Sequence, residues 1–399
     1  MLIHCTHHPI NPTNRINRTV RTMRIFFAIF LLGGLLLPTW VRADQGNGCA
    51  LASAMGHGAK PDIGLTAGTV FPSESFTRIP RIALWGDSHT SAGVFVDTLM
   101  DAWGQSPATG ARIRSSFIPA TMGLAGVRLP VRRYCLGSGW KSRLMQLSSD
   151  TPNDILWLDF GSAAQGNALK WINVHFNKTD AQGRLMLAVS INNGAEAMVG
   201  LSDRALPYFQ VRGDQPIETL RLRLVVGQIT LHSLEPAYMQ SPNVVLDVFS
   251  APGATASIWS RSSLQNQSPI PYDMVIFQYG TNEAANQSLD FQAYANHLRQ
   301  SLKRLREVHA HSRCVLIGAP DRGNGNYSAQ HQRVNAVQAR LSQDFDCEFW
   351  NWQAAMPEGM RSWANASLAQ PDLIHLTAKG YAQSARTFAK AIAPPWNLR

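Results

Sequence analysis

The sequence predicts an α/β domain whose parallel sheet is flanked by helices on both faces, with an all-β sandwich inserted into the domain. Two patterns lead to this fold class. In the last third of the chain, strand-like apolar runs alternate with amphipathic stretches of roughly 15–20 residues, which is typical of a parallel sheet. Between residues 154 and 246, short strand-like runs follow one another without helical periodicity, which favours a sandwich.

The α/β elements follow a loop-rich segment, residues 44–80, in which glycine and proline recur. Arg81–Trp85 is the first expected strand, and the spacing of apolar residues predicts a helix at Ser91–Trp103. Ile113–Pro119 is an expected second strand, whereas the Gly- and Arg-rich residues 120–153 are expected to be irregular. Later strands are expected at Val244–Phe249, Met274–Tyr279, Cys314–Ala319 and Cys347–Trp352, and later helices at Phe291–His309, Gln330–Phe345 and Thr377–Ile392.

The inserted sandwich is predicted from strand-like runs that start 10 to 15 residues apart, with turn residues such as Asn192-Asn193-Gly194 between them. The expected strands are Ile155–Phe160, Leu169–Phe176, Arg184–Ile191, Ala197–Gly200, Tyr208–Val211, Thr219–Val226 and Ile229–Leu234. We therefore assign residues 154–246 to the insert, and residues 44–153 and 247–399 to a discontinuous α/β domain.

The first residues of the chain predict a secretory signal peptide, residues 1–43. A basic stretch without acids precedes the apolar run from Ile25 to Leu37, and Ala43 is a small residue suited to cleavage. Met23 is a possible translation start that would give a shorter basic region. The alternative is an uncleaved membrane anchor, but the apolar run is shorter than the roughly 20 residues of a spanning helix.

Charge favours an anionic polymer as partner without implying nucleic acid. Residues 1–43 hold five arginines and no acid, so cleavage lowers the formal net charge from +10 to +5. The sequence has no basic patch with interleaved aromatic residues and no zinc-type Cys/His spacing. We expect no nucleic-acid partner, no metal and no other cofactor, and we expect a monomer.

Four cysteines remain after cleavage, Cys49, Cys135, Cys314 and Cys347, and an even number in an exported chain favours disulfides. Cys314 and Cys347 each open a strand-like run, so they could be neighbours in one sheet. Cys49 would then pair with Cys135. The sequence does not decide among the three possible pairings or exclude four free thiols.

The strongest chemical signal is Gly86-Asp87-Ser88-His89-Thr90, which follows the first expected strand and precedes a helix. A serine on such a turn lies at the rim of the sheet, where its backbone N–H can face an anion. Nucleophilic serines occupy such places because an oxyanion forms beside them. Ser88 is therefore the candidate nucleophile, provided that a base and oxyanion donors follow later strands.

Such groups follow two later strands and precede the last helix. Gly253 and Asn282 come after expected strands, where a backbone N–H and a carboxamide can donate to an oxyanion. Asp372 and His375 lie three residues apart before the last helix, so one turn of loop lets the carboxylate reach the ring. Each alone is more often a turn, cap or packed residue, and Gly253 has rivals in Gly280 and the glycines at 123 and 126.

The order of these residues predicts an acyl-transfer site. Ser88 attacks, His375 accepts its proton, and Asp372 orients His375 and stabilises the imidazolium. The N–H groups of Ser88 and Gly253 and the Asn282 side chain form the oxyanion hole.

These four blocks, Gly86-Asp87-Ser88, Gly253, Gly280-Thr281-Asn282-Glu283 and Asp372-x-x-His375, resemble those of the SGNH (GDSL-like) hydrolases. His89 replaces the usual leucine and Glu283 the usual aspartate, while Asn282 is retained. The Gly-Asp-Ser-His-Thr and Gly-Thr-Asn-Glu forms, with a β-insert between the first two blocks, resemble the peptidoglycan O-acetylesterases of Gram-negative bacteria. The resemblance implies a flavodoxin-like three-layer α/β fold and an insert similar to a family-35 carbohydrate-binding module.

The resemblance also implies a periplasmic serine carbohydrate esterase of the cell wall. It would remove O-acetyl groups from peptidoglycan, at the muramoyl C-6 hydroxyl, through an acetyl-enzyme and without a metal. One alternative is an esterase or O-acetyltransferase acting on another exported polysaccharide. An alternative of another class is a non-catalytic glycan-binding protein, against which the complete triad argues.

Other residues have more than one interpretation. His89 is either a second base or metal ligand, or, as we favour, a side chain that packs at the start of the helix. Asp and Asn residues of the insert could bind calcium, but no ligand spacing indicates it. Trp171, Phe176, Tyr208 and Phe209 could form a sugar-stacking platform, although aromatic residues of sandwich strands are more often core.

Overall fold

The computed structural model describes most of the chain beyond the predicted signal peptide, which lies outside the described residues. The described residues are 59–64, 79–91, 93–105, 110–119, 133–143, 146–161, 168–178, 184–201, 208–257, 271–323 and 325–398. Val41–Arg399 forms one compact unit. None of the helices in the described residues is both long and apolar enough to cross a membrane.

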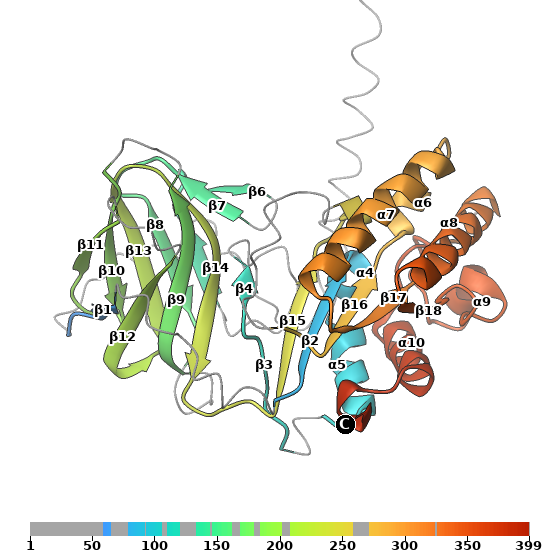
Figure 1. Ribbon diagram of the computed structural model, residues 1–399, viewed down its shortest axis with the longest axis horizontal. Helices are drawn as coiled ribbons and strands as arrows, with labels where there is room; N and C mark the ends of the chain where they lie inside the picture. Colours follow the sequence, from blue (N-terminus) through green and yellow to red (C-terminus); the bar gives the residue numbers. More distant parts are fainter. Residues whose placement is uncertain are drawn as a thin grey trace, which may run out of the picture. The chain divides into compact units, whose positions relative to one another are not determined.

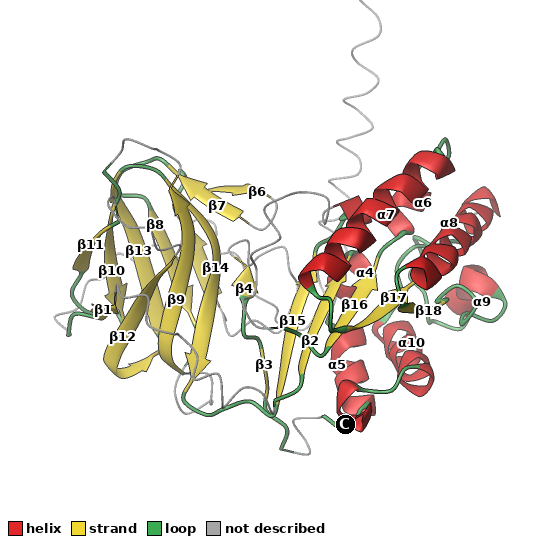
Figure 2. Ribbon diagram, in the orientation of Figure 1, coloured by secondary structure: helices red, strands yellow, loops and turns green. Residues whose placement is uncertain are grey.

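A six-stranded parallel sheet carries the α/β part of the fold (Figures 1 and 2), with the strand order β18-β17-β16-β2-β15-β3. Its strands are β2 (Arg81–Gly86), β3 (Ile113–Arg114), β15 (Val244–Ser250), β16 (Met274–Gln278), β17 (Arg313–Ile317) and β18 (Cys347–Trp350). Every residue of β2, β15 and β16 is buried, because helices cover both faces. The prediction of a parallel sheet flanked by helices is confirmed.

The helices are α4 (Ser88–Ser91), α5 (Val94–Ala102), α6 (Thr281–Ala284), α7 (Phe291–Val308), α8 (Gly325–Asp344), α9 (Gly359–Asn365) and α10 (Ala378–Ala391), followed by the 3-10 helix η5 (Pro395–Leu398). Successive residues of β2 point to opposite faces of the sheet. Ile82 and Leu84 pack in the cluster of α5 and α10, whereas Ala83 and Trp85 pack in that of α7 and α8.

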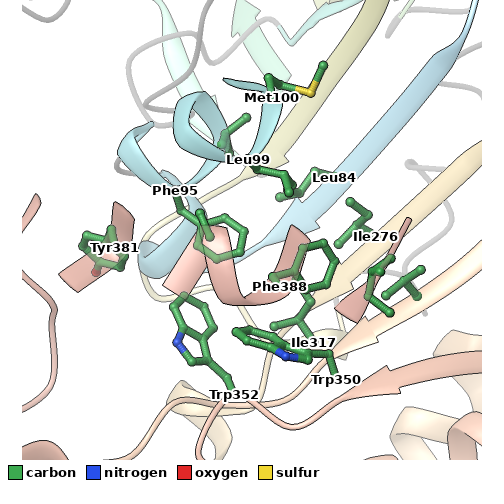
Figure 3. Close-up of a cluster of buried hydrophobic side chains, with 14 of the residues drawn as sticks. Leu84, Phe95, Leu99, Met100, Ile276, Ile317, Trp350, Trp352, Tyr381 and Phe388 are labelled. Atoms are coloured by element: carbon green, nitrogen blue, oxygen red, sulfur yellow. The ribbon is translucent and has the colours of Figure 1, made fainter. Parts of the chain in front are cut away.

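The cluster under α5 and α10 holds helix α10 against the sheet, and with it the loop that precedes α10. Figure 3 shows Phe388 of α10 among aromatic and aliphatic side chains from α5 and the strands. The labelled neighbours are Leu84, Phe95, Leu99, Met100, Ile276, Ile317, Trp350, Trp352 and Tyr381. Thr377 caps α10, since its hydroxyl accepts from the Gly380 N–H at 3.2 Å. The residues just before Thr377 are thereby fixed at the helix start.

The antiparallel part consists of two sheets packed face to face, as predicted for a sandwich. One has the order β1-β12-β9-β14-β7-β6, with β4 also paired to β14, and the other has the order β11-β10-β13-β8-β5. The strands are β1 (Asp62–Gly64), β4 (Ile118–Pro119), β5 (Arg133–Leu136), β6 (Lys141–Arg143), β7 (Gln146–Ser149), β8 (Ile155–Asp159), β9 (Leu169–Lys178), β10 (Met186–Ile191), β11 (Ala197–Gly200), β12 (Tyr208–Ile217), β13 (Thr219–Val226) and β14 (Ile229–Tyr238).

Two sequence predictions before residue 154 need correction. The expected strand Ile113–Pro119 is split, because β3 pairs with β15 in the parallel sheet and β4 pairs with β14 in an antiparallel one. The buried carboxylate of Asp247 causes the break: it accepts hydrogen bonds from the backbone N–H groups of Ser116 and Phe117 at 2.7 and 3.0 Å. These N–H groups are then unavailable to a sheet.

Residues 120–153 are not irregular throughout, since β5, β6 and β7 lie within them and join the antiparallel sheets. These strands span three or four residues each, too short for a period-2 pattern to stand out. The sheets thus include residues that the sequence assigned to the α/β domain. The division into a hydrolase domain and an insert stays a prediction.

One of the expected disulfides joins neighbouring strands. Cys314 of β17 and Cys347 of β18 lie directly opposite each other in the parallel register and are bonded. Cys135 is disulfide-bonded as well, and its expected partner Cys49 lies outside the described residues.

Candidate active site

Ser88 lies at the edge where the sequence places it: it is the first residue of α4, directly after the turn that follows β2 at the carboxyl edge of the parallel sheet. Gly86 ends β2, and a Cβ atom there would collide with the Thr90 hydroxyl and come 2.9 Å from Gln278 Oε1. The turn therefore requires a glycine at this position.

Buried polar contacts tie the Ser88 turn to the two neighbouring strands. Thr90 Oγ1 lies 2.7 Å from Ser250 Oγ of β15 and donates to Gln278 Oε1 of β16 at 3.2 Å. The Asp87 N–H donates to the same Gln278 oxygen at 3.2 Å. Side chains of the two strands that flank β2 thus hold the backbone that carries the candidate nucleophile.

The three residues predicted to act together are hydrogen-bonded in series. His375 Nε2 lies 3.1 Å from Ser88 Oγ, and His375 Nδ1 lies 2.7 Å from Asp372 Oδ2. Because an ionised carboxylate only accepts, Nδ1 carries a proton and donates a hydrogen bond to Asp372. Nε2 is then free to accept the Ser88 hydroxyl proton. The side chains of His375 and Asp372 remain 29% and 43% exposed, so a polymer can reach them.

Asp372 is held as a carboxylate by the loop that also carries His375. Its Oδ1 accepts the backbone N–H groups of Ile374 and His375 at 2.9 and 3.0 Å. Burial alone would raise the pKa of Asp372, but the hydrogen bonds from the His375 ring and from the two N–H groups outweigh it and lower the pKa to about 2.

The Asp372–His375 loop is itself anchored. Leu373 adopts a left-handed φ of 54°, which turns the chain between the acid and the base. The Leu373 carbonyl accepts the Gly323 N–H at 3.1 Å, and the His375 carbonyl accepts the Gln370 N–H at 2.7 Å. The geometry of the acid–base pair is thus built locally, within one short loop.

The candidate oxyanion donors lie on two loops that are linked to each other. Gly253 stands in an exposed turn with a φ of 78°, and Ala251 of that turn donates its N–H to the Gly86 carbonyl at 3.0 Å. Asn282 Nδ2 donates to the Ala254 carbonyl at 2.8 Å and keeps a second amide hydrogen. The structure therefore brings the Gly253 turn, the Asn282 amide and the end of β2 together.

Glu283 makes a link that the sequence did not predict. One carboxylate oxygen accepts the Ala256 N–H at 2.8 Å and the other accepts the Gly280 N–H at 3.1 Å, so Glu283 joins the loops after β15 and β16. Burial raises the pKa of this carboxyl. The signal in the sequence is a glutamate three residues after a helix N-cap position, which is the spacing of a capping box.

His89 is fully buried at the start of α4, in agreement with the interpretation that it packs there. Its Nδ1 lies 3.2 Å from the Tyr381 hydroxyl, and its ring lies against those of His375 and Trp352. The backbone N–H of His89 donates to Asp87 Oδ1 at 2.9 Å. Among the described residues, no three His, Cys, Asp or Glu side chains gather as they would around a metal ion.

Two members of the proposed sugar-stacking platform are core residues instead. Phe176 and Phe209 are buried in the centre of the sandwich, where their rings pack together. Trp171 and Tyr208 lie on the other face of the same sheet, because they alternate with the core positions of β9 and β12. A platform of all four aromatic residues is therefore excluded.

Comparison with known proteins identifies the site's family. Residues 231–383 match the model of the GDSL-like Lipase/Acylhydrolase family. The chain contains a GDSL-like acylhydrolase domain. The match includes Gly253, Asn282, Asp372 and His375 and begins after Ser88. The family's name is that of lipases and acylhydrolases, which supports an ester hydrolase. No curated protein matches the chain.

Among solved structures, a peptidoglycan O-acetylesterase is similar in fold, with 21% identity and a TM-score of 0.57. The likeness covers 79% of this chain and 90% of that one, so it extends beyond the GDSL-like match to most of the described residues. A family two carbohydrate esterase from Cellvibrio japonicus is 11% identical over 66% of this chain and 95% of that one, with a TM-score of 0.29.

Proposed function

We propose that the protein is an exported serine esterase that removes O-acetyl groups from peptidoglycan, at the C-6 hydroxyl of muramoyl residues. The hydrogen-bonded series Ser88–His375–Asp372 carries the proposal. The GDSL-like match supports ester hydrolysis, and the shared fold with a peptidoglycan O-acetylesterase supports the polymer. The signal peptide predicted from residues 1–43 supports a periplasmic location, with membrane attachment only if that segment stays uncleaved.

The first half-reaction forms an acetyl-enzyme. Ser88 Oγ attacks the acetyl carbonyl carbon while His375 Nε2 takes the hydroxyl proton, and Asp372 stabilises the imidazolium that results. The bond between the acetyl carbonyl carbon and the sugar oxygen then breaks, and His375 returns the proton to the departing sugar oxygen. The products of this step are the free sugar hydroxyl and acetylated Ser88.

The negative charge that develops on the acetyl oxygen needs donors that are already in place. The backbone N–H groups of Ser88 and Gly253 and the remaining Asn282 amide hydrogen are proposed for this role. The hydrogen bond from Asn282 to Ala254, together with the two bonds to Glu283, fixes the two loops before substrate arrives.

The second half-reaction returns the enzyme to its starting state. His375 takes a proton from water, the hydroxide attacks the acetyl-Ser88 carbonyl, and the proton passes back to Ser88 Oγ as acetate leaves. A sugar hydroxyl in place of water would make the same protein an O-acetyltransferase.

The test compares Ser88→Ala with the wild type and with Ser288→Ala, an exposed serine on the loop after α6. We expect Ser88→Ala to lower kcat on p-nitrophenyl acetate by about 10³-fold or more, while Ser288→Ala stays at the wild-type level. Retained turnover in Ser88→Ala would exclude the nucleophile assigned here. A sulfonyl fluoride that fails to label wild-type Ser88, while the protein still binds sacculi, would favour the non-catalytic glycan-binding alternative.

The polymer is tested separately, by acetate release from O-acetylated sacculi and from acetylated xylan. Faster release from sacculi supports the proposed substrate. Serine-dependent hydrolysis of p-nitrophenyl acetate without release from sacculi would exclude peptidoglycan and leave another exported polysaccharide as the substrate.

A further inference from the structure

Arg322 lies on the same edge of the parallel sheet as Ser88. It follows β17, and the carboxyl ends of parallel strands meet at one edge, where α/β proteins bind their ligands. β17 is separated from β2 only by β16. The mechanism above makes no use of this cation.

The loop of Arg322 is bonded directly to the loop of the acid and the base. Gly323 donates its N–H to the Leu373 carbonyl at 3.1 Å, and the Gly323 carbonyl accepts from Arg361 Nε at 2.7 Å. Arg322 is thus one residue from a contact with Leu373, which stands directly after Asp372. The loop is held there from both sides.

The guanidinium of Arg322 is positioned without a carboxylate partner. Its Cζ lies 4.2 Å from the centre of the Tyr327 ring, which is close enough for a cation–π interaction. No carboxylate among the described residues lies within ion-pair distance of it. Asp372 is near enough for its charge to act on Arg322, but both of its oxygens already accept hydrogen bonds from His375 and Ile374.

We propose that Arg322 is an anion-binding subsite that holds a carboxylate of the acetylated glycan while the acetyl ester lies at Ser88. Guanidinium groups bind carboxylates through two parallel hydrogen bonds, and stacking on Tyr327 restricts the side chain before the ligand arrives. A half-buried cation that lacks a protein carboxylate gains most from a ligand that brings one.

This inference rests on the proposed function and adds a substrate class to it. Acetylated polymers that carry carboxylates beside the ester are preferred over neutral ones. The peptide side chains of peptidoglycan carry such carboxylates, and so do the uronates of acetylated pectin, whereas acetylated xylan without uronate branches serves as the neutral polymer.

The experiment measures kcat/KM of wild type, Arg322→Gln and Arg340→Gln with O-acetylated sacculi, acetylated pectin, acetylated xylan and p-nitrophenyl acetate. Arg340 is the matched control because it is an exposed arginine on α8, the helix of Tyr327, about 20 Å farther along the axis. We expect Arg322→Gln to lose about tenfold on the two anionic polymers and to match the wild type on the two neutral substrates. Arg340→Gln should match the wild type on all four.

A second arm changes the substrate instead of the protein. Amidation of the peptide carboxyl groups of sacculi should lower the kcat/KM of the wild type to that of Arg322→Gln. The kcat/KM of Arg322→Gln itself should not change. Equal losses on neutral and anionic substrates, or no loss on either, would overturn the subsite. If sacculi are not hydrolysed, peptidoglycan fails as the substrate, but acetylated pectin against acetylated xylan still decides the role of Arg322.

Discussion

The ring of His89 lies 5.5 Å, centroid to centroid, from the ring of His375. His89 comes from the helix that begins with Ser88, and His375 comes from the loop before α10. Tyr381 connects the two segments, because its hydroxyl contacts His89 Nδ1 at 3.2 Å and is hydrogen-bonded to the backbone of Leu376. Burial keeps the pKa of His89 well below the usual range, so the neighbour of the proposed base stays uncharged.

We predict that Tyr381→Phe lowers activity because it shifts the proposed base, His375, and that it lowers the stability of the fold only slightly. The phenyl ring preserves the packing on α10, while His89 and Leu376 lose their shared partner. We expect kcat on p-nitrophenyl acetate to fall by about tenfold with KM nearly unchanged, and the free energy of unfolding to fall by about 1 kcal/mol. Tyr134→Phe, in the five-stranded sheet, is the control. A wild-type kcat in Tyr381→Phe would show that this contact does not position His375.

Glu283→Gln is expected to impair the oxyanion loops. A glutamine has one oxygen for two N–H donors, so its amide nitrogen faces either Ala256 or Gly280 as a second donor. We expect kcat to fall by about 10- to 100-fold, since misplaced oxyanion donors act mainly in the transition state. Steady-state kinetics with p-nitrophenyl acetate measure the loss, and Glu307→Gln on the exposed face of α7 is the control. The link has no catalytic effect if both variants keep the wild-type kcat.

Asp87 gives the stability of the protein a specific pH dependence. Burial raises the pKa of this carboxyl from 3.8 to about 7, so the folded state keeps a proton that the unfolded chain has lost. Its contribution to stability is fully present below pH 3.8 and is lost as the pH rises to about 7. Summed over this interval, the loss amounts to about 4 kcal/mol.

The side chain of Asn does not titrate, so Asp87→Asn should lack this pH dependence. We expect the free energy of unfolding of the variant, relative to the wild type, to increase between pH 5 and pH 8. Urea denaturation at the two pH values measures the difference. Parallel changes in the two proteins would mean that Asp87 is already ionised in the fold at pH 5.

The bond between Cys314 and Cys347 is expected to act on stability alone. It closes a segment with a sequence separation of 33 and lies near the start of β17, at the opposite end of the strand from the active-site edge. We expect the double variant Cys314→Ala/Cys347→Ala to lose about 3 kcal/mol of unfolding free energy and to keep its kcat at 25 °C. Thermal unfolding of the variant, compared with that of the wild type under non-reducing conditions, tests this. Unchanged stability would contradict it.

Much of the α/β architecture could be predicted from the sequence, because its signals are long or repeated. The helices Phe291–Val308 and Ala378–Ala391 were expected within one residue at each end, since each has a capping residue and an apolar face. The candidate site was found for a related reason. Parallel strands bring their carboxyl ends to one edge, so Ser88 and Asn282 lie at the same edge of the sheet although they are far apart in the chain.

The contacts that arise only in three dimensions could not be predicted. Asp247 breaks the strand expected at 113–119 through hydrogen bonds that span 131 and 130 residues of sequence. Glu283 joins two loops whose proximity depends on the strand order. Three- and four-residue strands such as β6 and β7 form because neighbouring strands supply backbone hydrogen-bond partners. No local sequence pattern reveals these partners.

Asp372 and His375 form a unit that is complete within four residues, whereas the contact between His375 and Ser88 spans 287 positions of the chain. Any shift of the loop as a whole would widen that one gap and leave the base correctly oriented and its carboxylate in place. Proton transfer in the proposed mechanism therefore depends on one long-range distance, that between His375 Nε2 and Ser88 Oγ. Conservative substitutions in the hydrophobic cluster beneath α10 are therefore expected to change the activity by moving this loop, without altering Ser88, His375 or Asp372.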